Sequence, residues 1–210
     1  MAIFDPKTKD QITKIFNNVT EDVRIEVYDE SEDTPMVEFI TELCSFSDKL
    51  TCAYYDPVCE RSRELGIERI PGLNLTRADA EDQGVRFSGI PAGHEINSLI
   101  AAILELGGAG AVLAPELEER AANIKGPLDI KVFVTLGCPH CPGAVLRSHK
   151  LAVMNPNIKA EMIEAETFSQ LAMQYDVSAV PKMVFSNGEE LIGDQPFEAI
   201  LAAAEIEAAV

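Results

Sequence analysis

Basic residues are scarce in this chain of 210 residues, and their scarcity narrows the classes of function. There are 17 Lys and Arg against 35 Asp and Glu, which gives a formal net charge of −18. Proteins that bind nucleic acid need clustered Lys and Arg to neutralise phosphates, and the chain has no such cluster. We therefore expect no nucleic-acid partner and attribute the acidic charge to solubility.

Long apolar runs and a secretion signal are missing as well. No stretch approaches the roughly 18 apolar residues of a membrane-spanning helix, and Met1 to Pro6 do not place an apolar segment after a basic one. The cysteines number 5 and are irregularly spaced, which is not typical of the disulfide framework of a secreted protein. We expect a globular cytoplasmic protein without membrane association.

What the sequence does contain is one order of helices and strands that occurs twice. Glycines 107, 108 and 110 form the strongest linker signal in the chain. Residues 176–181 match residues 66–71, and residues 188–193 match residues 84–89. We predict an α/β protein with two tandem units, residues 1–108 and 112–210, each with a central mixed four-stranded sheet flanked by helices.

Only the second unit carries a cysteine pair at its first turn, in the segment Cys138-Pro139-His140-Cys141. An apolar run, 130–136, precedes it, and an amphipathic helical pattern, 143–154, follows it. A helix N-terminus stabilises a thiolate, so Cys138 is expected to attack disulfides and Cys141 to resolve the mixed disulfide. Residues three apart on a helix hold their Cβ atoms about 5–6 Å apart, whereas a relaxed disulfide needs about 3.8 Å, so we expect an easily reduced bond.

A proline follows the cysteine pair about forty residues later, at the start of a predicted strand. Proline in that position usually marks an edge, a turn or a cis peptide bond. We predict that Val180-Pro181 is cis, faces the two cysteines, and leaves the Val180 backbone free to pair with an extended substrate; a simple turn proline is the alternative. Ile70-Pro71 is expected to share this geometry without the chemistry.

Basic side chains near the cysteines are candidates for tuning them. A cationic His140 would stabilise the attacking thiolate, although an exposed histidine without a role is the alternative. Arg147, His149 and Lys150 are expected to give the following helix a basic face that orients partners or complements the helix C-terminus. Lys182, beside Pro181, is expected to be solvated, and stabilisation of the same thiolate is the alternative.

The remaining candidates are expected to be structural. The first unit has Ser31 to Thr34 at the matching turn, which we interpret as a helix N-cap without disulfide exchange. Cys44, Cys52 and Cys59 are predicted to be buried, inert thiols. His94 is expected at a helix start, and a docking role for its glycine-rich loop stays open.

A zinc site is the main alternative to a redox role for the cysteine pair. Cys138 and Cys141 with His140 or His149 supply part of a site, but a structural zinc needs four ligands and the sequence has no second pair at the required spacing. We expect no metal, and a zinc-holding or non-catalytic binding module remains an alternative of a different class. No G-x-G-x-x-G follows a strand, so no flavin or nicotinamide site is expected.

Three segments together resemble the glutaredoxin-like protein disulfide oxidoreductases of archaea and bacteria, which are tandem thioredoxin folds: 138–142, 178–182 and 89–95. The chain is also similar to the N-terminal domain of the alkyl hydroperoxide reductase flavoprotein, which shares the Gly-His-Glu loop and the stretches 154–159 and 166–168. The resemblance implies that Cys138 attacks, Cys141 resolves and Pro181 is the cis-proline. Many two-site members keep a cysteine pair in each half, whereas the first half here is silent, as it is in the flavoprotein domain.

The resulting hypothesis is a thiol–disulfide oxidoreductase whose redox group is its own disulfide, without a further cofactor. It would relay electrons from a thioredoxin-reductase-like flavoprotein to disulfides of other proteins, a peroxiredoxin being one client. A protein disulfide oxidase or isomerase is the alternative, because Pro139-His140 resembles the dipeptide of strongly oxidising periplasmic thioredoxin-fold enzymes.

Overall fold

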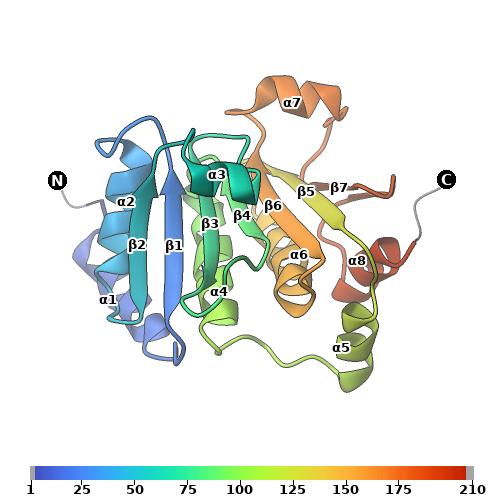
Figure 1. The fold of residues 1–210 in the computed structure, drawn as a ribbon, viewed down its shortest axis with the longest axis horizontal. Coiled ribbons are helices and arrows are strands. Elements are labelled where there is room, and N and C mark those ends of the chain that lie inside the picture. Colours follow the sequence, from blue (N-terminus) through green and yellow to red (C-terminus); the bar gives the residue numbers. More distant parts are fainter. Residues whose placement is uncertain (1–2, 207–210) are drawn as a thin grey trace.

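A computed structural model of the chain describes residues 3–206 (Figure 1). The first half contains helices and strands in an order that the second half repeats almost completely. Its elements are α1 (Pro6–Phe16), β1 (Val23–Tyr28), α2 (Pro35–Cys44), β2 (Leu50–Tyr55), α3 (Glu60–Leu65), β3 (Gly72–Arg77), β4 (Val85–Ser88), the 3₁₀ turn η1 (Gly93–Glu95) and α4 (Ile96–Leu106). The second half contains α5 (Pro115–Ala122), β5 (Leu128–Val134), α6 (Cys141–Met154), β6 (Ile158–Glu164), α7 (Ser169–Gln174), β7 (Lys182–Phe185), β8 (Glu190–Ile192) and α8 (Phe197–Ala204).

The helix ends follow the local signals in the sequence. Asp5 caps α1, since its carboxylate accepts hydrogen bonds from the backbone N–H groups of Lys7 and Thr8, and Pro6 occupies the first helical turn. The apolar run 130–136 lies only partly in a strand: β5 spans Leu128–Val134, and the next residues form the loop that leads to the cysteines. The helix after that loop begins at Cys141 rather than at residue 143.

The eight strands found within residues 3–206 form one sheet, in the order β2-β1-β3-β4-β6-β5-β7-β8. Each half therefore has its own mixed four-stranded arrangement, as predicted, but the two arrangements are continuous with one another. The join is a parallel pairing of β4 with β6, from Val85 opposite Ala160 to Ser88 opposite Ile163. The outer edges of the whole sheet are β2 and β8.

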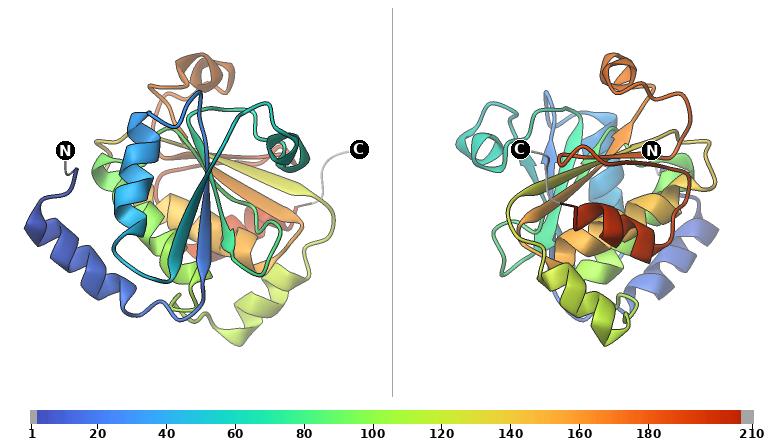
Figure 2. Two further views of the ribbon diagram at one scale, coloured as in Figure 1. Left: turned by 60° about the vertical axis from the view of Figure 1, so that its left-hand side comes forward. Right: turned by 90° about the vertical axis from the view of Figure 1, so that its right-hand side faces the viewer.

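Helices cover both faces of this sheet. In Figure 1, α3 lies in front of the strands, whereas α2, α4 and α6 lie behind them. Helices α4 and α6, from different halves, pack against each other, and α8 packs against α6 (Figure 2). One hydrophobic cluster runs through both halves and includes Val85 and Phe87 of β4 with Ala160 and Met162 of β6. The core is therefore shared between the halves.

Polar contacts reinforce the same join. Arg69 lies in the loop before β3, and its guanidinium donates to both carboxylate oxygens of Glu161 on β6, each over 2.7 Å. Ser88 at the end of β4 donates its hydroxyl to the same carboxylate. Bidentate arginine–carboxylate pairs are the more specific kind of ion pair, so these contacts help to fix the register of the two halves.

Gly84 lies immediately before the joining strand and allows a close backbone approach. Its φ is +67°, and a Cβ at this position would lie 2.3 Å from the Ile158 carbonyl oxygen. Gly84→Ala is therefore expected to lower the free energy of unfolding by about 2 kcal/mol or more, as measured by urea denaturation. Gly66→Ala is the matched control, since Gly66 has the same φ but its Cβ would contact nothing. It should cost only about 1 kcal/mol, and equal losses in the two variants would contradict a tight join.

Candidate active site

The predicted cysteine pair lies in the connection between β5 and α6. Cys138 precedes the helix in a turn in which its N–H donates to the Thr135 carbonyl over 3.1 Å, and Cys141 is the first residue of α6. The two cysteines form a disulfide with their Cα atoms 5.5 Å apart. Because Cys138 lies outside the helix, the spacing of helical neighbours does not describe this pair. The ease with which the bond is reduced stays a prediction.

The two sulfur-bearing residues differ in access to solvent. Cys138 is 9% exposed, whereas Cys141 is completely buried. Pro139 and His140 between them are both exposed, and His140 occupies the N-cap position of α6 without a capping side-chain bond. A partner approaching from solvent therefore reaches Cys138 first, at the N-terminus of a helix of 14 residues.

The Val180-Pro181 segment lies against the first cysteine. The peptide bond between these residues is cis, and the Val180 carbonyl oxygen is 3.9 Å from the Cys138 sulfur. Ser178 and Ala179 are exposed, and within residues 3–206 no carbonyl accepts a hydrogen bond from the Val180 N–H. A free backbone edge next to Cys138 is the geometry that an extended peptide needs in order to pair with the protein.

The first half repeats this backbone arrangement without cysteines. Ile70-Pro71 is also cis, and the Pro71 carbonyl accepts from Gly89 N over 2.8 Å just as the Pro181 carbonyl accepts from Gly193 N over 2.8 Å. At the turn that matches the cysteines, Thr34 is the N-cap of α2 and accepts from the Val37 N–H. The N-cap interpretation of this turn is confirmed.

A buried carboxyl that the sequence analysis missed lies behind the site. Glu95 ends η1 and is completely buried, with a hydrogen bond from the Ser98 hydroxyl. The 3₁₀ turn packs against α6, and the His94 N–H donates to the Leu136 carbonyl over 2.9 Å, two residues before Cys138. Burial raises the pKa of Glu95 to about 7. His94 itself is exposed at the start of the helical segment, as expected.

The basic face predicted for α6 is wrong. Lys150 is buried and pairs with Glu105 over 2.6 Å, while Arg147 pairs with Asp194 on the loop before α8. His149 is buried with its Nε2 3.0 Å from the Arg86 carbonyl oxygen, and burial lowers its pKa to about 4. Arg147 and Lys150, three residues apart, do lie on the same side of the helix, but each is paired with a carboxylate, and His149 is buried, so the three side chains do not form a free basic face.

Two further expectations need correction. Lys182 is buried rather than solvated, and its ammonium donates to the Tyr175 carbonyl and pairs with Glu190, each over 2.8 Å. Of the three other cysteines, only Cys44 is buried; Cys52 is exposed, and Cys59 is half-buried at the N-cap of α3. Neither lysine nor cysteine burial could be inferred from residue type alone.

The described part of the chain holds no cluster of three or more His, Cys, Asp or Glu side chains that could bind a metal ion. His149, one of the histidines considered as a ligand, lies between α6 and β4 in contact with Phe87. Within residues 3–206, none of the helices combines the length and the apolar character needed to span a bilayer.

Comparison with known proteins agrees with this geometry. Residues 128–204 match the thioredoxin domain family model. The crystal structure of the NTD_N/C domain of alkyl hydroperoxide reductase AhpF from Enterococcus faecalis is 30% identical, with a TM-score of 0.89 over 96% of this chain and 99% of that one. A protein disulfide oxidoreductase from Aeropyrum pernix, 24% identical, has the same fold with a TM-score of 0.86 over 100% of this chain and 97% of that one.

A curated relative is considerably longer than this chain. A NADH dehydrogenase from Ferdinandcohnia aciditolerans is 29% identical over 203 residues, which are 95% of this chain but 37% of that protein. The chain thus spans roughly a third of the length of the curated relatives that it matches. The similarity concerns one region of those proteins.

Proposed function

This chain belongs to the family of tandem thioredoxin-fold domains that includes the N-terminal domain of the alkyl hydroperoxide reductase flavoprotein, and from that premise we propose that it is an electron relay. Residues 112–210 exchange electrons through the Cys138–Cys141 pair, and residues 1–108 are a silent unit. The observation that carries the proposal is Cys138, the more exposed of the two cysteines, beside the free backbone of Val180. The chain is a thiol–disulfide oxidoreductase, and the identity of its partners is what we propose.

The reaction begins with both cysteines reduced. The Cys138 thiolate attacks one sulfur of a substrate disulfide, forms a mixed disulfide, and releases the other substrate sulfur as a thiolate that takes up a proton. The Cys141 thiolate then attacks the Cys138 sulfur, which forms the intramolecular disulfide and releases the second substrate thiol. Two electrons have passed to the substrate, and a reductase must return two electrons to the pair.

The residues around the pair have distinct parts in this reaction. Val180 holds the substrate backbone, since its carbonyl borders Cys138 and its N–H has no partner within residues 3–206, and Pro181 keeps that edge in place. The exposed Pro139 and His140 border the attacking sulfur and are the residues that tune it. Glu95 lies behind this loop. Because its pKa is raised to about 7, its carboxyl stays protonated at acidic pH.

We propose a thioredoxin-reductase-like flavoprotein as the electron donor and protein disulfides, including that of a peroxiredoxin, as the acceptors. One relative supports this direction, because its name is alkyl hydroperoxide reductase. The reduction potential separates this proposal from an oxidase or isomerase. A value near about −270 mV would support a relay, whereas one near about −120 mV would contradict it.

Trapping identifies the partners. Cys141→Ser leaves Cys138 able to attack but removes the thiol that resolves the mixed disulfide, so client proteins should stay covalently bound and be found by mass spectrometry after non-reducing purification. The double variant Cys138→Ser, Cys141→Ser is the control and should capture none of them. Capture of equal sets by both variants would refute the relay through Cys138.

A further inference from the structure

One loop of the second half carries the backbone edge beside Cys138, and a buried lysine closes that loop. Residues 176–181 connect α7 to β7, and Lys182 is the first residue of β7 and is 5% exposed. Its Nζ donates to the carbonyl of Tyr175, the residue just before the loop, over 2.8 Å. The lysine side chain therefore joins the two ends of the loop.

Few other contacts hold the middle of this loop. The amides of Ser178 through Val180 donate no hydrogen bond to another backbone group within residues 3–206. Asp176 opens the loop with a φ of +48°, a left-handed conformation that is uncommon outside glycine. The carbonyl that Lys182 binds belongs to the peptide unit immediately before Asp176. A donor on that carbonyl therefore restrains the turn that sets the direction of the loop.

The partners of the lysine are themselves fixed to the sheet. The ring of Tyr175 packs against Phe133 of β5, with the ring centroids 5.4 Å apart. The Lys182 ammonium also pairs with Glu190 of β8 over 2.8 Å, but half of the Glu190 side chain is exposed. Exposed ion pairs contribute little, so the bond to the Tyr175 carbonyl is the main restraint on the loop.

The silent half has the same loop without the lysine. Residues 66–71 match residues 176–181, and the next position is Gly72 instead of Lys182. A Cβ on Gly72 would lie 2.6 Å from the Arg69 carbonyl oxygen, so a side chain does not fit there unless the backbone shifts. The half that lacks the cysteine pair therefore also lacks a lysine that closes the loop.

We propose, on the basis of the disulfide exchange proposed above, that Lys182 is a positioning residue that raises the affinity for extended protein substrates. By closing the loop it holds the Val180 backbone in the conformation that pairs with a peptide, so the substrate does not have to order the loop when it binds. The Lys182 ammonium is already bound to Tyr175 and Glu190, and we assign it no direct role at the Cys138 sulfur.

The first experiment compares two substrates, insulin and hydroxyethyl disulfide, which has no peptide backbone. Lys182→Met keeps the length of the side chain but removes its hydrogen-bond donors. It should raise KM for insulin at least about fivefold with kcat nearly unchanged, and leave kcat/KM for hydroxyethyl disulfide within about twofold of the wild type. Lys182→Arg keeps a donor and should restore most of the affinity for insulin. Lys159→Met replaces an exposed lysine and is the matched control.

A direct effect of the lysine on the attacking sulfur would give a different result. The pH midpoint for alkylation of Cys138 in the reduced protein should be the same in the wild type and in Lys182→Met. A shifted midpoint, or equal losses of kcat/KM with the two disulfides, would overturn the proposal. An unchanged KM for insulin would overturn it as well.

Hydrogen exchange examines the loop without turnover. In the oxidised protein, the amides of residues 176–180 should exchange at least about threefold faster in Lys182→Met than in the wild type, and those of α6 should not. Equal exchange in the loop would overturn the proposal. If Lys182→Met does not fold, Lys182→Gln replaces it, since its side chain is shorter but keeps a polar end. A wild type that reduces neither disulfide would contradict the proposed function, whereas hydrogen exchange would still decide whether Lys182 holds the loop.

Discussion

Replacing Cys138 with serine is expected to slow the reduction of protein disulfides by about a thousandfold or more. The serine hydroxyl does not ionise near neutral pH, and in the proposed reaction the Cys138 sulfur is the group that forms and breaks the bond to the substrate. The buried Cys141 cannot take over, because its side chain is completely shielded from solvent. The measurement is insulin or peroxiredoxin reduction with dithiothreitol or a flavoprotein reductase as donor.

A matched control for this variant comes from the silent half. Ser31→Ala changes the turn that corresponds to the cysteine pair, where the Ser31 hydroxyl accepts a hydrogen bond from the Asp33 N–H. It should leave the rate of disulfide reduction within about twofold of the wild type. Full activity of the Cys138 variant would exclude the proposed reaction, whatever the partners are.

The second large effect concerns stability and pH. Glu95 has an ordinary carboxyl pKa near 4.5 when the chain is unfolded and a pKa near 7 when it is folded. Between these values the folded protein holds one more proton than the unfolded chain, so the free energy of unfolding falls as the pH rises through that range. The shift corresponds to about 3 kcal/mol, fully lost once the pH exceeds the folded pKa.

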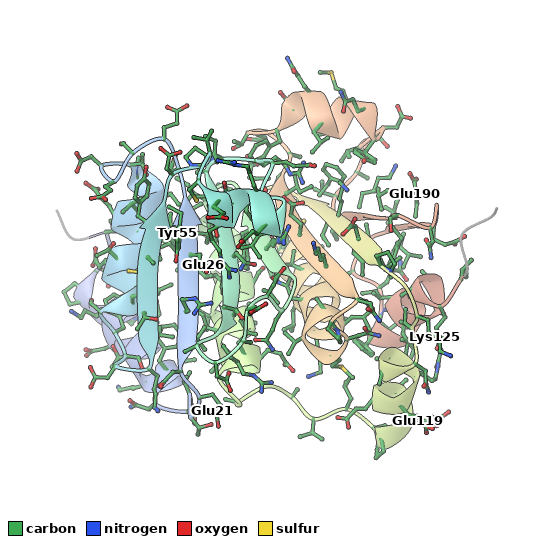
Figure 3. All side chains as sticks on the ribbon, in the orientation of Figure 1. Glu21, Glu26, Tyr55, Glu119, Lys125 and Glu190 are labelled. Carbon is green, nitrogen blue, oxygen red and sulfur yellow. A yellow bond between two sulfur atoms is a disulfide. The ribbon has the colours of Figure 1, made fainter. Side chains whose placement is uncertain are left out.

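Glu95→Gln is expected to remove this dependence. The amide keeps the shape of the side chain and a hydrogen bond to Ser98 but carries no charge at any pH. Compared with the wild type, the variant should gain about 3 kcal/mol of relative stability between pH 4.5 and pH 7.5, measured by urea denaturation. The control is Glu119→Gln on α5, whose exposed side chain is labelled in Figure 3 and whose replacement should produce no such trend.

The buried His149 changes the free energy of unfolding with pH in the opposite direction. It must therefore be present in both proteins that this test compares. The folded pKa of His149 is about 4, below its ordinary 6.5, so its contribution to stability is present above pH 6.5 and declines as the pH falls toward 4. Because both members of the Glu95 comparison retain His149, its effect cancels. A difference between wild type and Glu95→Gln that does not vary with pH would show that the buried carboxyl stays ionised.

Much of this protein could be predicted from local patterns. The cysteine pair and the two prolines that precede strands each depend on residues that are close in the sequence, such as Val180 and Pro181, and the duplication is visible as a repeat of such short patterns. The caps of α1 and α2 also followed from single residues, Asp5 and Thr34. The single continuous sheet did not, because the pairing between β4 and β6 joins residues 75 positions apart, such as Val85 and Ala160, and leaves no periodic signal.

The misjudged residues share one physical cause. Lys150, Lys182 and Glu95 are charged residue types that the fold buries, and each has a polar partner there: Glu105 for Lys150, Glu190 for Lys182 and Ser98 for Glu95. Glu26 is a further case: it is buried on β1 and accepts from Tyr28, Asn74 and Arg61, which come from three elements. Figure 3 shows Glu26 on β1, with Tyr55 on the neighbouring strand β2. A prediction based only on amphipathic patterns assigns such charged residues to the surface.

The pairing of β4 with β6 amounts to a dimer interface enclosed within one polypeptide. Separate units would have to meet by diffusion, whereas the connection between α4 and α5 keeps the two surfaces at a high effective concentration. The Lys150 ammonium holds that connection in place, since it donates to the Ala111 carbonyl over 2.6 Å. The half without a cysteine pair thereby acts as a permanently bound subunit that covers the strand edge of its catalytic neighbour. A substitution that destabilises the first half should therefore also impair the reaction of the second half.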